Sequence, residues 1–185
     1  GKSLGFRVGN VDNHAGYIEY GEGEEMAAVL GHMDVVPAGE GWKYPPFEGE
    51  IHDGIMYGRG VLDDKGPTIG AIYALKAIRD LGLPLDRRIR VIFGTNEERG
   101  SSCIQYYVDH GEEQPVMGIT PDAEYPLIFF EKGMFTASCG YEEVKQGKIR
   151  VLEFQAGTAF NVVPSQCRLV LEGDHVIPET EGVTV

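Results

Sequence analysis

The stretch GPTIGAIYALKAIRDLGLPLDRRIRVIFG, residues 66–94, indicates the fold class. In its first part the apolar residues recur at helical spacing, and Pro67 suits the first turn of a helix. The pattern therefore predicts a helix over 66–81 that Gly82 ends. The second part, 88–94, is rich in Ile, Val and Phe and is typical of a buried strand. A long helix followed directly by such a strand indicates an α/β domain.

Strands and helices also alternate on both sides of this stretch. The segment 26–31 is almost wholly apolar, as expected for a central strand that is covered on both faces. The other expected elements are a helix at about 101–110 and strands at 15–20, 47–51, 55–58, 116–119 and 127–130. This order predicts a layered α/β domain. From about residue 146 the pattern changes to strands without obvious helices, so we expect one domain over 1–145 and the beginning of a second over 146–185.

The amino-acid composition argues against several kinds of binding partner. The chain has 185 residues, of which 42% are hydrophobic, and 16 basic against 29 acidic residues give a net charge of −13. Such an acidic chain repels phosphate backbones and anionic lipids, so we expect neither nucleic-acid nor membrane partners. No apolar run approaches the roughly 20 residues that cross a bilayer. Three widely spaced cysteines favour free thiols and a reducing compartment, which predicts a cytoplasmic location.

A histidine and an aspartate follow the apolar strand in Gly31-His32-Met33-Asp34. In an extended chain, His32 and Asp34 point to the same side, so the carboxylate can orient a metal-binding imidazole. The alternative is a loop histidine beside an unrelated aspartate. Taken alone, this cluster favours the loop histidine.

Two adjacent carboxylates precede the long helix in the segment GRGVLDDKG, residues 58–66. Asp63 and Asp64 can cap the helix or bind a metal. A phosphate site is disfavoured because the GxxxxGK[ST] spacing is absent and two carboxylates would repel a phosphate.

Carboxylates follow two further predicted strands, as Glu97 and Glu98 in one case and Asp122 in the other. Carboxylates at the mouth of a buried sheet are costly unless they hold a cation or a proton. Since ligands of open α/β sheets bind at the carboxyl ends of the strands, the recurrence of four such clusters predicts a metal site. Histidine and carboxylates without cysteine suit Zn²⁺, with Mn²⁺ or Co²⁺ as alternatives. Two metals that share a carboxylate would activate a water, and a neighbouring metal-free Glu would act as general base.

Five segments, in this order, resemble the dinuclear zinc peptidases that include carboxypeptidase G, aminoacylase and succinyl-diaminopimelate desuccinylase. They are VDNHAGYIEYGEG, GHMDVVPAGEGW, GRGVLDDKGPT, GTNEERGSSC and TPDAEYPLIFFEKG, and they cover most of residues 5–140. The chain is most similar to bacterial dipeptidases with carnosinase-like (Xaa-His) activity. The resemblance implies a partial α/β/α zinc-peptidase catalytic domain over 1–145. It also implies the beginning of an α+β lid domain over 146–185, which Asn161-Val162-Val163-Pro164 would open.

The resemblance also assigns roles to individual residues. The implied ligands of two zinc ions are His32, Asp63, Glu98 and Asp122. Asp63 would bridge the two metals, and its peptide bond to Asp64 would be cis. The implied catalytic residues are Glu97, as general acid and base, and Asp34, which would orient the His32 imidazole.

The sequence departs from the family pattern in one respect. The family binds its second metal with a further histidine far downstream, and no residue of this sequence matches that histidine. The remaining histidines lack the right context and are expected at the surface or in the core: His14, His52, His110 and His175. We therefore expect an internal fragment of a chain more than twice as long, inactive by itself. The whole protein would hydrolyse dipeptides, as a monomer or a homodimer. The alternatives are an N-acyl amino acid deacylase or desuccinylase, and a catalytically dead scaffold.

Overall fold

The computed structural model describes residues 1–122, 128–130, 132–133, 135, 137, 149–157, 163–164 and 166–173. The chain divides into two units, Gly1–Phe129 and Phe130–Val185. The predicted boundary between 145 and 146 lies outside the described residues, as do 161 and 162 of the predicted lid opening. Within the described residues, no helix is both long and apolar enough to cross a membrane.

A five-stranded mixed sheet forms the centre of the first unit, with the strand order β1-β2-β6-β3-β7. A short 3₁₀ helix, Lys2–Leu4, precedes it. The strands are β1 (Arg7–Val11), β2 (Ala15–Tyr20), β3 (Met26–His32), β6 (Arg88–Gly94) and β7 (Met117–Ile119). β3 runs parallel to β6 and β7, whereas β2 is antiparallel to β1 and β6. The carboxyl ends of β3, β6 and β7 consequently lie at one edge of the sheet.

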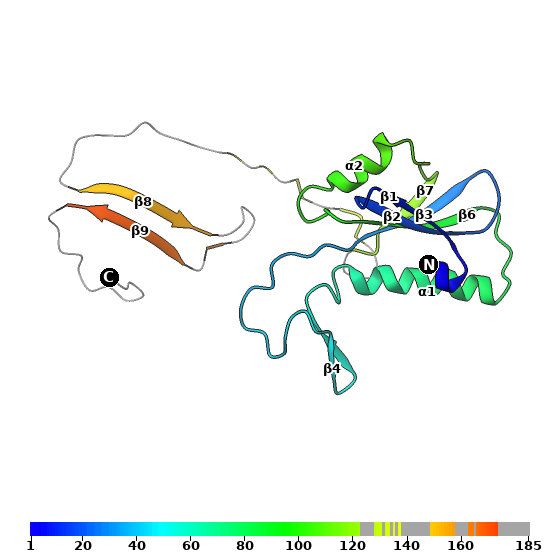
Figure 1. Ribbon diagram of the computed structural model, residues 1–185, viewed down its shortest axis with the longest axis horizontal. Coiled ribbons are helices and arrows are strands. Elements are labelled where there is room, and N and C mark those ends of the chain that lie inside the picture. The colour runs from blue at the N-terminus through cyan, green and yellow to red at the C-terminus, as the bar shows by residue number, and fades with distance from the viewer. Residues whose placement is uncertain are drawn as a thin grey trace. The chain divides into compact units, whose positions relative to one another are not determined.

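Two helices, α1 (Lys65–Asp80) and α2 (Ser102–Asp109), cover opposite faces of this sheet (Figure 1). On one face, Ile72 and Leu75 of α1 pack in a core cluster with Val91 of β6. On the other face, Tyr107 of α2 packs in a second cluster that includes Met26 and Ile92. This arrangement confirms the predicted layered α/β/α architecture.

The helix α1 ends at Asp80, one residue before the predicted end. Gly82 has φ = 62°, a left-handed conformation that glycine adopts without steric cost. The Leu83 N–H donates to the carbonyl of Ile78 at 3.1 Å, which satisfies one of the carbonyls at the helix end. Gly82 therefore ends α1 through its backbone conformation.

Two features differ from the sequence-based expectations, and the strand order is a third that the sequence patterns do not predict. β1 was not predicted, because only Val8 and Val11 are apolar aliphatic side chains in it, and it forms by pairing with β2. β2 and β3 follow each other in the sequence, but β6 lies between them in the sheet. The expected strand at 127–130 is wrong for its described part, since residues 128–130 are not in a strand, and residue 127 lies outside the described residues.

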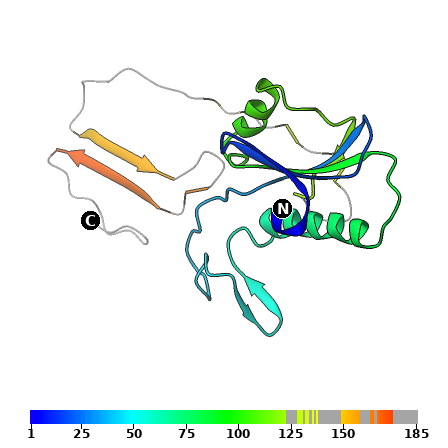
Figure 2. The ribbon, with the colours of Figure 1, turned by 45° about the vertical axis from the view of Figure 1, so that its right-hand side comes forward.

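Two small antiparallel pairs complete the described elements. In the first unit, β4 (Glu50–His52) and β5 (Ile55–Tyr57) form a hairpin around Asp53 and Gly54, and this hairpin projects away from the sheet (Figure 2). In the second unit, β8 (Arg150–Ala156) pairs with β9 (Cys167–Glu172).

Candidate metal centre

The predicted site residues come from four places in the fold that meet at the carboxyl edge of the parallel strands. His32 is the last residue of β3, and Glu97 and Glu98 lie in the loop after β6. Asp122 follows β7, and Asp63 lies just before α1. This edge is where open α/β sheets bind their ligands.

His32 lies at the centre of the candidate site. Its Nε2 atom is 3.0 Å from Oδ1 of Asp63 and 3.3 Å from Oδ2 of Asp122. One ligand atom from each of these three residues falls within 4.8 Å of the others, and this is the one such group in the part of the chain that the structure describes. The three side chains can therefore bind one metal ion together.

The other ring nitrogen of His32 is held by Asp34. Nδ1 lies 2.9 Å from the main-chain carbonyl oxygen of Asp34 and 3.4 Å from its carboxylate. A carbonyl oxygen can only accept, so in this hydrogen bond Nδ1 carries the proton. The lone pair of the neutral imidazole then lies on Nε2, which faces Asp63 and Asp122.

Asp64 holds the main chain of His32. Its carboxylate is fully buried, and Oδ2 accepts the His32 N–H at 3.1 Å and the Thr68 hydroxyl at 3.0 Å. Burial raises the pKa of Asp64 above its ordinary value. The peptide bond between Asp63 and Asp64 is cis, as the family resemblance implied.

This supporting contact was missed in the sequence, where Asp64 was considered only as a helix cap or a metal ligand. The available signal was a threonine four residues after Asp64, one helical turn away. That spacing alone does not show that the carboxylate also reaches the end of β3.

The loops that follow β3 and β6 are hydrogen-bonded to each other. The Glu97 N–H donates to Oδ1 of Asp34 at 3.0 Å, and the Glu98 N–H donates to Oδ2 at 3.1 Å. In the reverse direction, the Val36 N–H donates to Oε1 of Glu98 at 3.3 Å. Glu98 thus lies in a loop adjoining the three-residue group, although it is not a member of that group.

The electrostatics of the site favour a bound cation. Burial, together with the negative charge of Asp63, raises the pKa of Asp122 to about 6. Burial also raises the pKa of Glu97, with the neighbouring carboxylate of Glu98 adding to the effect. For His32, burial alone would lower the pKa, but the charge of Asp122 and the contacts with Asp34 outweigh it and raise it. A divalent ion would relieve this crowding of acidic groups.

The donor set fits the predicted metals. One imidazole nitrogen and two carboxylates are within reach of one ion, and no cysteine belongs to the group. Zn²⁺ accepts this combination, as do Mn²⁺ and Co²⁺.

The other described histidines lie elsewhere. His14 and His110 stack on the ring of Tyr106, with ring centroids 3.9 and 3.7 Å away, and His52 is 2.7 Å from Glu50. His175 lies outside the described residues. Among the described histidines, only His32 belongs to the candidate metal group.

Known proteins resemble this chain over most of its length. The Beta-Ala-Xaa dipeptidase of Lactobacillus delbrueckii subsp. lactis is 40% identical over 184 residues, which is 98% of this chain and 38% of that protein. The protein named "Putative dipeptidase YtjP" of Bacillus subtilis (strain 168) is 46% identical over 176 residues, which is 94% of this chain and 38% of that protein.

A solved structure is similar as well. The crystal structure of human carnosine dipeptidase 1 matches with a TM-score of 0.57 and 29% identity, over 67% of this chain and 31% of that chain. The present chain thus spans less than two fifths of the length of each of these relatives. Residues 28–176 match the family described as "Peptidase family M20/M25/M40". Because this match covers most of the sequence and agrees with the resemblance carried by the motifs, the chain belongs to peptidase family M20/M25/M40.

Proposed function

We propose that the whole protein is a zinc-dependent dipeptidase and that this chain carries much of its metal centre. The observation that supports this most is the meeting of His32, Asp63 and Asp122 at the carboxyl edge of the sheet, beside Glu97. The names of the relatives favour dipeptides as substrates.

The candidate residues divide into metal ligands and a proton carrier. His32, Asp63 and Asp122 would hold the metal, with Glu98 and Asp63 serving a second ion. Bound zinc would supply a Lewis acid that polarises the scissile carbonyl and lowers the pKa of a water.

Glu97 is proposed as the general base and acid. It would accept the proton of the attacking water and pass it to the amine that leaves when the peptide bond breaks. A carboxylate suits this role when its pKa lies above the ordinary value, because it can then both take up and release a proton near neutral pH. Burial and the surrounding carboxylates shift the pKa of Glu97 in this direction.

Two substitutions in neighbouring positions test this division of roles. Glu97→Gln in the whole protein should lower kcat by at least about 100-fold, because the proton acceptor is lost, and should leave the zinc content unchanged. Glu98→Gln makes the same chemical change one residue later and should lower the zinc content. Elemental mass spectrometry after dialysis and initial rates on Ala-His measure the two effects.

Either of two results would contradict these roles. Full activity of Glu97→Gln would remove Glu97 from the mechanism. A normal zinc content in Glu98→Gln would remove Glu98 from the ligands.

The substrate class is tested by comparing initial rates of the wild-type protein on Ala-His and Leu-Leu with those on N-acetyl amino acids. We expect faster hydrolysis of the dipeptides. Faster hydrolysis of the N-acetyl compounds would make the protein a deacylase, and no hydrolysis of either would support a scaffold without catalysis.

A further inference from the structure

We propose that the Asp34 carboxylate is a positioning residue for the loop that carries Glu97 and Glu98. This inference rests on the proposed function, in which Glu97 carries the proton and Glu98 binds metal. It adds a role distinct from the expected orientation of the His32 ring: Asp34 would hold Glu97, the proposed general base, in its position.

The carboxylate uses both of its oxygens on this loop. Oδ1 accepts the Glu97 N–H at 3.0 Å, and Oδ2 accepts the Glu98 N–H at 3.1 Å. Hydrogen bonds to an ionised carboxylate are stronger than neutral ones, and two parallel bonds also fix an orientation. The backbone of the two glutamates is thus held at consecutive positions by one side chain.

A third hydrogen bond closes the contact in the opposite direction. Oε1 of Glu98 accepts the Val36 N–H at 3.3 Å, so the loops after β3 and β6 hold each other. The beginning of the second loop is anchored separately, because the Thr95 hydroxyl donates to the main-chain oxygen of His14 at 2.8 Å. Between these anchors, Asp34 holds the N–H groups of Glu97 and Glu98. The Glu97 carbonyl is held separately, because it accepts the N–H of Gly100 at 3.0 Å and that of Ser101 at 3.2 Å within the loop.

The ring of His32 does not need the carboxylate for its tautomer. Its Nδ1 atom is closer to the main-chain oxygen of Asp34, at 2.9 Å, than to the carboxylate, at 3.4 Å. A substitution of the Asp34 side chain leaves this carbonyl in place. The two roles of the residue can therefore be separated by experiment.

Asp34→Asn is the decisive variant. The asparagine oxygen can still accept one N–H, but its amide group is itself a donor and would face the second N–H of the loop. We expect one hydrogen bond to be lost and the backbone of Glu97 and Glu98 to move. The control is Asp53→Asn, the same change at an exposed residue of the β4–β5 turn.

The readout is NMR on the metal-free whole protein labelled with ¹⁵N-glutamate. The two loop amides are identified by the loss of their signals in Glu97→Gln and Glu98→Gln. In Asp34→Asn at least one of the two amide protons should shift upfield and exchange faster with solvent, and in Asp53→Asn neither should change. The zinc dissociation constant, measured by competition with a chelator, should rise by about 10- to 100-fold in Asp34→Asn.

Unchanged amide signals in Asp34→Asn would overturn the proposal. If that variant does not fold, hydrogen exchange of the wild-type protein decides: protected amides at Glu97 and Glu98 are expected, and rapid exchange of both would overturn it. These measurements require no substrate, so a protein that fails to cleave dipeptides would refute the proposed function without touching this inference.

Discussion

Gly31 is the residue that permits β3 to lie close to the beginning of α1. A Cβ atom at this position would be 2.5 Å from Oδ2 of Asp64, and it would also overlap the Thr68 hydroxyl. Both side chains are fully or almost fully buried, so they have little room to move. The contact matters for the site because the same Asp64 oxygen accepts the N–H of His32.

We expect Gly31→Ala to lower the free energy of unfolding by about 1–3 kcal/mol, the usual cost of overpacking. Urea denaturation measures it. The control is Gly70→Ala in α1, where a Cβ atom meets nothing within 4 Å, and which should raise the stability by about 0.5–1 kcal/mol. Equal effects of the two substitutions would show that the space around Gly31 is not restricted.

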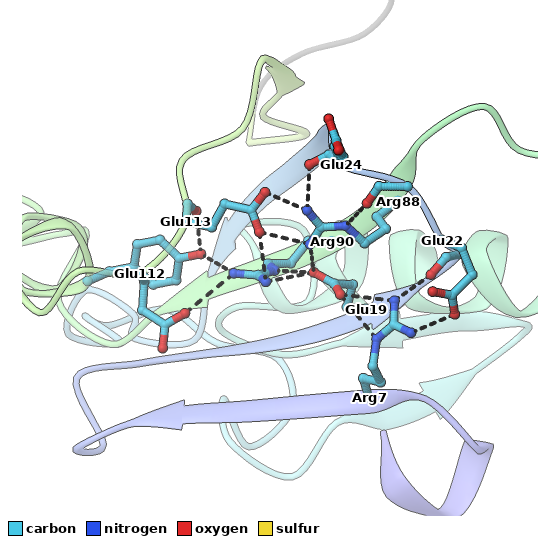
Figure 3. Close-up of polar contacts among 11 residues, drawn as sticks. Arg7, Glu19, Glu22, Glu24, Arg88, Arg90, Glu112 and Glu113 are labelled. Atoms are coloured by element: carbon cyan, nitrogen blue, oxygen red, sulfur yellow. Dashed lines mark hydrogen bonds and ion pairs between the residues drawn. The ribbon is translucent and has the colours of Figure 1, made fainter.

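At the scale of elements, a cluster of charged residues ties together β1, β2 and β6 (Figure 3). Glu19 of β2 lies opposite Arg90 of β6 in the strand register, and its Oε2 accepts the Arg90 Nε–H at 2.7 Å. Arg7 of β1 and Arg88 of β6 also donate to Glu19. Arg90 reaches the other layer as well, because it donates to the Tyr107 hydroxyl of α2 at 2.6 Å.

This cluster should contribute strongly to stability. Glu19→Gln removes the carboxylate nearest to the buried Arg90, whose other acidic partners, Glu112 and Glu113, are 3.5 and 3.8 Å away. Breaking a buried ion pair in this way costs about 3 kcal/mol. Urea denaturation at neutral pH measures the loss. The control is Glu24→Gln, in the loop between β2 and β3. Arg88 contacts only the main-chain oxygen of Glu24, so this substitution should change the stability by less than about 0.5 kcal/mol.

Glu19 should also make the free energy of unfolding depend on pH. Burial alone would raise the pKa of Glu19, but the hydrogen bond and charge of Arg90, with Arg88, outweigh it and lower the pKa below the ordinary value. The contribution of Glu19 is therefore complete above its unfolded pKa and is lost as the pH falls through its folded pKa. Between about pH 6 and pH 3, unfolding free energies should fall less in Glu19→Gln than in wild type. An equal fall of the unfolding free energy in both proteins would contradict the lowered pKa of Glu19.

At the scale of the whole molecule, the candidate metal centre joins distant parts of the chain. His32, Asp63 and Asp122 come from the end of β3, the start of α1 and the segment after β7. These elements are brought together only in the folded state, so a metal bound there stabilises the fold over the unfolded chain.

We therefore expect Zn²⁺ to raise the thermal midpoint of the chelator-treated whole protein. At a free concentration 100 times the dissociation constant, the gain is about 2.7 kcal/mol. Differential scanning calorimetry over a zinc titration measures it, with Asp63→Asn as the variant that should lose most of the effect. A midpoint that does not depend on zinc would argue against the site.

Sequence patterns are sufficient to predict the elements whose signals are local. The helix α1 and the strand β6 were predicted because apolar spacing, a first-turn proline and a terminal glycine act within a few residues of each other. The positions of the candidate ligands after strands followed from the same local patterns. The family assignment also needed the sequence alone, since the motifs carry it in order.

Features that depend on partners far along the chain are visible only in the folded protein. β1 has little apolar pattern of its own and pairs with β2. β6 pairs with both β2 and β3 and lies between them, although β2 and β3 are consecutive in the sequence. The contacts of Asp34 and Asp64 also join residues that are far apart in the sequence. Asp34 accepts from residues more than 60 positions away, and Asp64 from His32, 32 positions before it. Hydrogen bonds over such separations depend on the folded geometry, which local spacing does not encode.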